Sequence, residues 1–120
     1  MAELVIDGDD LVVRLTRWQK AMAAHGDVRV PLSAVRRVGV PDSKWLALRG
    51  WRSTGLNVPG KASFGTRRHG DGYDFVAVSG AHDEAVCVEL NGQRFGQLVV
   101  SADDAPAVAD RVAAAAGIHR

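Results

Sequence analysis

A chain of 120 residues is long enough for one hydrophobic core and too short for two, so we predict one domain over residues 1–120. The formal net charge of +1 gives no global field that would attract nucleic acid or a membrane. A single cysteine, Cys87, excludes an internal disulfide and is typical of a reducing compartment.

The first residues lack the basic start and long apolar core of a signal peptide. Moreover, no apolar run approaches the roughly 20 residues that a transmembrane helix needs. We therefore expect a cytoplasmic protein, with a peripheral contact to a membrane as the alternative.

The chain begins with the pattern of a β-hairpin. Asp7-Gly8 is a tight-turn sequence between two β-rich runs, 3–7 and 10–15. In the second run, Leu11, Val13 and Leu15 recur with the period of a strand that has one buried face. The nearby acids Asp7, Asp9 and Asp10 could form a calcium loop, but the later bidentate glutamate is missing, so we interpret them as turn residues.

A short helix is predicted next. Thr16 and Gln19 have the spacing of a capping box, and Gly26 would end the helix after about His25. Trp18, Ala21 and Met22 share one face, which we expect to cover an open end or edge of the sheet. On this interpretation Trp18 belongs to the core; a platform for a ligand is the alternative.

Two strands follow, over 27–31 and 32–40. Pro31 places the first at a sheet edge or a strand end. The uneven spacing between Val35 and Val38 predicts a bulge or bend near Arg36-Arg37. Residues 43–60 then form a connection with little periodicity that holds Trp45 and Trp51. We expect this loop to fold back on the body and to bury at least one tryptophan. Both tryptophans are candidate interaction residues for a homodimer or another protein, with an unpaired strand edge as the other candidate.

The second half predicts a series of hairpins and a final helix. The expected strands are 61–69, 73–79, 84–90 and 93–100, with turns at 70–72, 80–83 and 91–92. A helix is predicted over 105–116, since it is preceded by cap residues at 101–104, has Pro106 in its first turn and is followed by Gly117. Val108, Val112 and Ala115 share one stripe of this helix. The fold class predicted is mainly β with a C-terminal helix (α+β): a small barrel or bent antiparallel sheet capped by that helix.

Several short motifs occur together in this chain: Leu48-Arg49-Gly50-Trp51-Arg52, Gly55, Pro59-Gly60, Gly65-Thr66, Phe75, Val88-Glu89-Leu90 and Asp103-Asp104-Ala105-Pro106. In these motifs the chain resembles bacterial pleckstrin-homology-like (PH-like) domain proteins of high-GC bacteria, and the resemblance covers most of the chain from about Leu11. Lys61-Ala62-Ser63 departs from it, because an apolar segment is expected there. The resemblance implies a PH-like fold and no particular activity.

No enzymatic constellation emerges from the sequence. The histidines, His25, His69, His82 and His119, lack the spacing of metal ligands, and Cys87 lies in mid-strand, where an inert thiol is expected. The serines lack a nucleophile-elbow context, and the glycines of 50–70 do not form a phosphate-binding loop. We therefore predict a non-catalytic protein with no cofactor and no metal.

The one chemical signal is a basic segment. Between Lys44 and Gly70 there are six basic residues and no acidic one. The candidate anion-binding residues are Arg49, Arg52, Lys61, Arg67 and Arg68. Strand periodicity points Arg67 and Arg68 to opposite faces, so only one of them could join Arg49 and Arg52 around a phosphate or carboxylate.

The basic segment has several interpretations. It can be a solvated loop and an edge strand protected by charge, or it can bind an anionic lipid headgroup, a small anion or an acidic protein. Nucleic acid is disfavoured, since six charges are few for it. We predict an interaction module for a protein partner or self-association, with binding of an anionic ligand or membrane surface through 44–69 as the alternative.

Overall fold

The computed structural model describes residues 3–23, 26–41, 51–58, 62–69, 72–79 and 84–118. The elements are β1 (Glu3–Asp7), β2 (Asp10–Arg14), α1 (Arg17–Ala23), β3 (Val28–Pro31), the 3-10 turn η1 (Leu32–Ala34), β4 (Val35–Gly39), β5 (Trp51–Val58), β6 (Ala62–His69), β7 (Gly72–Ser79), β8 (Glu84–Leu90), β9 (Phe95–Ala102) and α2 (Ala105–Ala116). Their content confirms the predicted class, mainly β with a C-terminal helix.

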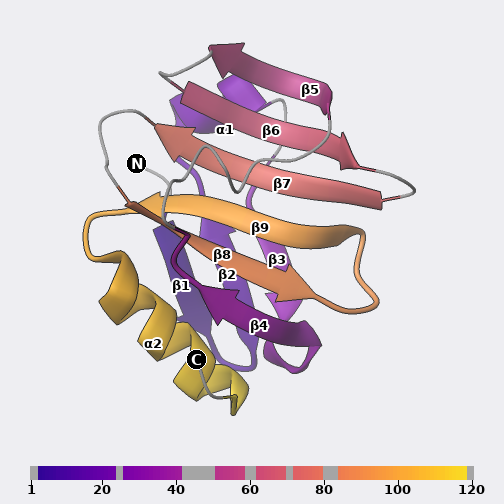
Figure 1. The fold of residues 1–120 in the computed structure, drawn as a ribbon. Helices are drawn as coiled ribbons and strands as arrows, with labels where there is room; N and C mark the ends of the chain where they lie inside the picture. The colour runs from indigo at the N-terminus through magenta and orange to yellow at the C-terminus, as the bar shows by residue number, and fades with distance from the viewer. Residues whose placement is uncertain are drawn as a thin grey trace.

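The strands form two sheets. The smaller has the order β1-β2-β3, and the larger has the order β4-β8-β9-β7-β6-β5. Figure 1 shows the smaller sheet behind the larger one, with its strands crossing at a steep angle, and α2 beside β4 and β8. Apolar side chains of both sheets, such as Leu11, Val13, Phe75 and Leu98, join with α2 in one buried cluster. Burial of this cluster is the main stabilising term of the fold.

Short-range signals predicted several local features correctly. Gly8 has φ 61° in the β1–β2 hairpin, and Gly92 has φ 66° in the turn between β8 and β9. These are the left-handed conformations that glycine adopts at little cost. The register of β4 against β8 shifts between Val35 and Arg37, where a bulge or bend was predicted.

The hairpin predicted across Asn91-Gly92 is confirmed, since β8 and β9 pair antiparallel. One predicted hairpin, between 73–79 and 84–90, is wrong, because β9 lies between β7 and β8 and is parallel to β7. The physical reason is burial on both faces: Leu98, Val99 and Val100 are at most 1% exposed, so β9 is a central strand. The barrel is not confirmed either, because the described strands form two separate sheets.

The predicted 43–60 loop is also wrong in part. Residues 51–58 form β5, which pairs with β6 in antiparallel register at the end of the larger sheet. Gly55, Asn57 and the polar run 52–54 give this stretch no strand pattern in the sequence. In the structure it pairs with β6 along its length. Trp45, Arg49 and Lys61 lie outside the described residues, so the predictions made on them stay predictions.

The predicted helix 105–116 is confirmed as α2. The Asp104 carboxylate accepts a hydrogen bond from the Ala107 amide at 3.4 Å, and Gly117 ends the helix with φ 74°. The buried face consists of Ala105, Ala109, Val112 and Ala113. The predicted stripe is therefore corrected: Val112 is buried, Val108 is half-buried and Ala115 is exposed.

Candidate functional site

The candidate site is a surface on α1, where a large apolar side chain is exposed. Four of its side chains, Arg17, Trp18, Lys20 and Ala21, are exposed, and the Trp18 side chain has 79% of its surface in contact with solvent. We call these four residues the α1 patch. The prediction of Trp18 as a core residue is wrong, because the face that carries Trp18 and Ala21 turns away from the sheet. Arg17, Trp18 and Ala21 line a hollow of about 430 Å³.

The sequence around α1 holds this helix in place. Its first turn closes with a hydrogen bond from the Lys20 amide to the Thr16 carbonyl at 2.9 Å. Asp27 then ties both flanks together: its carboxylate accepts from the Leu15 amide at 2.8 Å and lies 3.7 Å from the Lys20 ammonium. The end of β2, the helix and the start of β3 are thus joined through one carboxylate. On its inner side α1 lies against β5 and β6 (Figure 1).

The predicted anion-binding arginines are partly separated. The register places Arg52 opposite Arg67, and Arg67 opposite Asp74. Asp74 is 1% exposed, and neither it nor Arg67 lacks an interaction partner. Arg68 is exposed and opposite Tyr73, which lies on the other face of the sheet from Asp74. The divergence of Arg67 and Arg68 is as predicted, and the acid beside Arg67 lowers its value as an anion ligand.

Polar residues continue from Asp74 across the outer face of the larger sheet. Gln97 is opposite Asp74, Glu89 is opposite Gln97, and Glu89 pairs with Arg37 at 3.4 Å. Among the residues described, every buried side-chain nitrogen and oxygen has a hydrogen-bond partner. The row therefore consists of satisfied structural contacts. Cys87 lies on the same face, two residues before Glu89 on β8, and is half-buried. It lines a hollow of about 230 Å³ together with Arg37 and Glu89.

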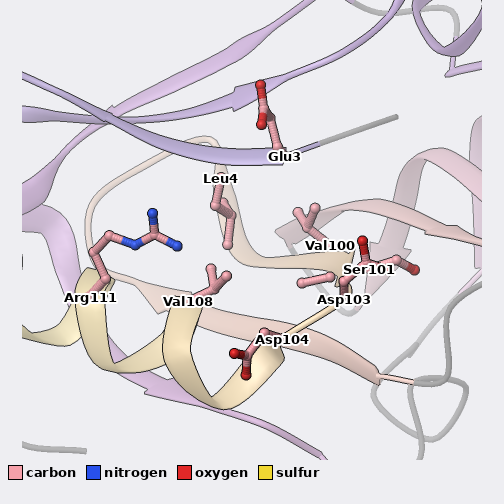
Figure 2. Close-up of a pocket in the computed structure, with 9 residues that line it drawn as sticks. Glu3, Leu4, Val100, Ser101, Asp103, Asp104, Val108 and Arg111 are labelled. Carbon is pink, nitrogen blue, oxygen red and sulfur yellow. The ribbon is translucent and has the colours of Figure 1, made fainter.

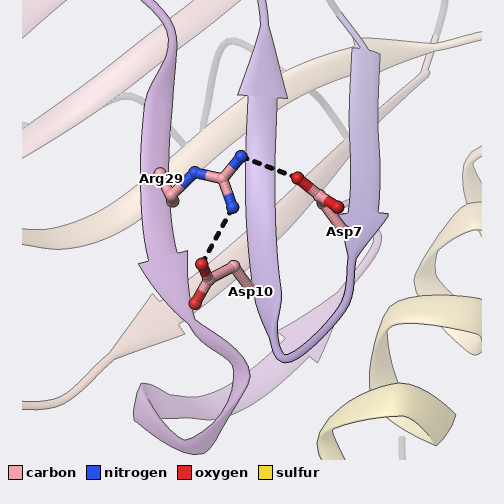
Figure 3. A network of polar contacts seen from close by, with 3 residues as sticks. All are labelled: Asp7, Asp10 and Arg29. Carbon is pink, nitrogen blue, oxygen red and sulfur yellow. Dashed lines mark hydrogen bonds and ion pairs between the residues drawn. The ribbon is translucent and has the colours of Figure 1, made fainter.

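A second set of charges lies on the outer face of the smaller sheet. Arg29 donates to Asp7 at 2.7 Å and to Asp10 at 2.8 Å, as Figure 3 shows. The hydrogen bond from Arg29, followed by its charge, holds the pKa of Asp7 below its ordinary value. The bonds to Asp7 and then Asp10 raise the pKa of Arg29. This contact agrees with the interpretation of the acidic residues as turn residues, because Asp7 and Asp10 both form ion pairs with Arg29.

A hollow of about 240 Å³ lies where β1 and β9 meet α2. Leu4 and Val108 point toward each other across it, with Arg111 on one side and Asp103 on the other (Figure 2). Asp104 already caps α2, and Asp103 has an interaction partner of its own. The space is small for a ligand, since ligand pockets usually enclose about 300–1,000 Å³.

Two features are absent from the described part of the chain. No group of three or more His, Cys, Asp or Glu side chains gathers there in a way that could hold a metal ion. Among the helices of that part, none has the length and apolar character to cross a membrane.

Comparison with known proteins adds no identity. Neither family models, curated proteins nor solved structures gave a match to this chain.

Sequence reasoning gave Trp18 as a ligand platform only as the alternative to a core residue, and it did not include Arg17, Lys20 or Ala21 in a site. The available signal was that Trp18 lies between two basic residues, Arg17 and Lys20. If the ring of Trp18 were buried, these charged groups would lie next to the core.

Proposed function

We propose that this protein is a non-catalytic binding module that contacts its partner through the α1 patch. The observation that carries the proposal is the 79% exposure of Trp18. Among the side chains whose exposure the structure describes, it is the one large apolar side chain that is exposed. An exposed indole forgoes about 2–3 kcal/mol of burial energy, and tryptophan with arginine is the usual composition of binding hot spots.

A photo-crosslinking amino acid at position 18 tests this proposal inside the cells that make the protein. Trp18 is exposed, so the replacement leaves the core untouched. The control carries the same group at Arg36, which is exposed on β4 at the opposite edge of the larger sheet from β5 and β6. We expect a covalent adduct from position 18 and none from position 36. Equal yields, or no adduct from position 18, would contradict the proposal.

Binding of a small anion or an anionic lipid headgroup by the basic segment is the second candidate. Its support is Arg68, which is exposed and forms no ion pair with another described residue. Titration with inorganic phosphate at low salt, followed by NMR, tests it. Arg68→Gln should abolish any saturable shift, whereas Arg36→Gln should not. A parent protein that shows no saturable shift removes this candidate.

Self-association is the remaining partner hypothesis. β5 stands last in the strand order of the larger sheet, so a second copy could pair along that strand. The molar mass from light scattering across a range of concentrations tests this hypothesis. A monomer at the highest concentration would remove it. We also propose a cytoplasmic location for this protein and membership of the PH-like proteins that it resembles.

A further inference from the structure

We infer that the partner of the α1 patch is an acidic protein segment that places an apolar side chain beside Trp18. This inference rests on the proposed function and specifies the chemistry of the partner. It depends on three properties of α1: the exposed indole, the hollow next to it and the charge of the neighbouring side chains.

The hollow accounts for the apolar part of the partner. Ala21 follows Trp18 by three residues, so the two side chains are neighbours on one side of the helix. Both side chains, together with Arg17, line the hollow of about 430 Å³. An apolar side chain inserted there would cover both the ring and the alanine methyl group. Water is removed from two apolar surfaces at once, which is the driving force of such a contact.

The charges account for the acidic part of the partner. Arg17 is exposed and has no ion pair with any residue in the described ranges. Lys20 lies 3.7 Å from Asp27, but both side chains are more than a third exposed, so this pair is weak and can be exchanged. None of the seven residues of α1 is acidic. Carboxylates on the partner would complement this surface and accelerate encounter.

Two other occupants fit less well. A second copy bound to the same patch would oppose Arg17 and Lys20 to their own equivalents, and like charges at an interface are unfavourable. A membrane would meet one indole and two basic groups, whereas sequences that bind anionic lipid usually present about four to eight basic residues. An arginine that flanks a single exposed tryptophan matches a protein hot spot better than a lipid anchor.

A random peptide library displayed on phage, selected on the immobilised full chain, tests this inference. The recovered peptides are synthesised, and their affinities are measured by fluorescence polarisation. We expect enrichment of Asp and Glu around one large apolar residue, with affinity that falls as salt is added. Trp18→Ala should weaken binding roughly 30-fold, and Arg17→Gln up to about fivefold. Arg36→Gln, a matched loss of charge on β4, should change the affinity less than about twofold.

The other outcomes overturn the inference. Peptides without excess acidic residues, peptides that bind Trp18→Ala as well as the parent, or a selection with no Trp18-dependent peptide would each do so. Vesicles of phosphatidylcholine, with and without phosphatidylserine, are tested in parallel. Trp18-dependent binding to the anionic vesicles alone would make a membrane the occupant. In that case crosslinking from position 18 would still succeed, so the proposed function would stand while this inference fails.

Discussion

The two helices of this protein give the same signal in sequence and have opposite roles in the structure. Each was predicted from a cap residue and an apolar stripe at helical spacing. α2 buries Ala105, Ala109, Val112 and Ala113 against the sheets. In α1, by contrast, Arg17, Trp18, Lys20 and Ala21 are all exposed. Periodicity shows which residues share a face, but whether a sheet lies opposite that face is a property of the tertiary fold.

The largest expected effect comes from placing a charge on each helix. Ala109 is 0% exposed, so Ala109→Asp places a carboxylate in the core. This substitution should lower the free energy of unfolding by about 3–5 kcal/mol or prevent folding. Ala21→Asp makes the same chemical change on an exposed position and should cost less than about 1 kcal/mol. Denaturant unfolding of both variants checks the contrast. Similar losses in the two would show that α1 is packed as tightly as α2.

Truncation of the apolar side chains should give a smaller difference. Val112→Ala removes two methyl groups from a side chain that is 1% exposed, and should lower the free energy of unfolding by about 2 kcal/mol. Trp18→Ala removes far more apolar surface, yet should change it by less than about 0.5 kcal/mol, because that surface is already in water. If Trp18→Ala lowered the free energy of unfolding more than Val112→Ala does, Trp18 would have to be a core residue and the account would be wrong.

Variants at Asp27 sharpen the account of what holds α1. Asp27→Ala removes the acceptor of the Leu15 amide and should cost about 1 kcal/mol, with faster hydrogen exchange across α1 and little change in α2. Asp27→Asn keeps an acceptor oxygen and loses only the exposed pair with Lys20, so a few tenths of a kcal/mol are expected. Equal effects of the two substitutions would mean that the charge, and not the hydrogen bond, holds the helix.

The smallest effect concerns the charges of the smaller sheet. The pKa of Asp7 is lowered by Arg29, so the contact stabilises the fold above the ordinary pKa of an aspartate. That contribution should disappear as the pH falls through the lowered pKa of Asp7. An NMR titration of the Asp7 carboxyl carbon, in the parent and in Arg29→Gln, checks the sign. A carboxyl that titrates at the same pH in both proteins would show that the contact does not persist in solution.

Much of this fold was predictable because its signals are local. Asp7-Gly8, Asn91-Gly92 and the caps of α2 fix turns and ends through backbone conformations that few other residues adopt. The alternation of Val86, Val88 and Leu90 with Ala85 and Cys87 is also a local signal, and the two sets lie in the two separate buried clusters. These features depend on residues close together in the chain.

What failed depends on residues far apart. The insertion of β9 between β7 and β8 is set by long-range pairing, although the run of Leu98, Val99 and Val100 could have indicated a central strand. β5 has no alternation of its own, and its partner β6 supplies its hydrogen bonds. For the candidate site, the sequence predicted that Arg67 and Arg68 diverge. It could not show that a buried Asp74 lies opposite Arg67, or that Trp18 faces solvent.

The exposure of Trp18 and its contact with a partner can be measured together by fluorine NMR on protein labelled with fluorotryptophan. The resonance of position 18 is the one missing from the Trp18→Phe variant. We expect it to show a solvent isotope shift close to that of free fluorotryptophan, since 79% of the side chain is exposed. Addition of a selected acidic peptide should reduce that isotope shift and move the resonance of position 18. A resonance that is protected from solvent in the free protein, or that is unmoved by a bound peptide, would contradict the central claim that α1 presents Trp18 as the contact surface.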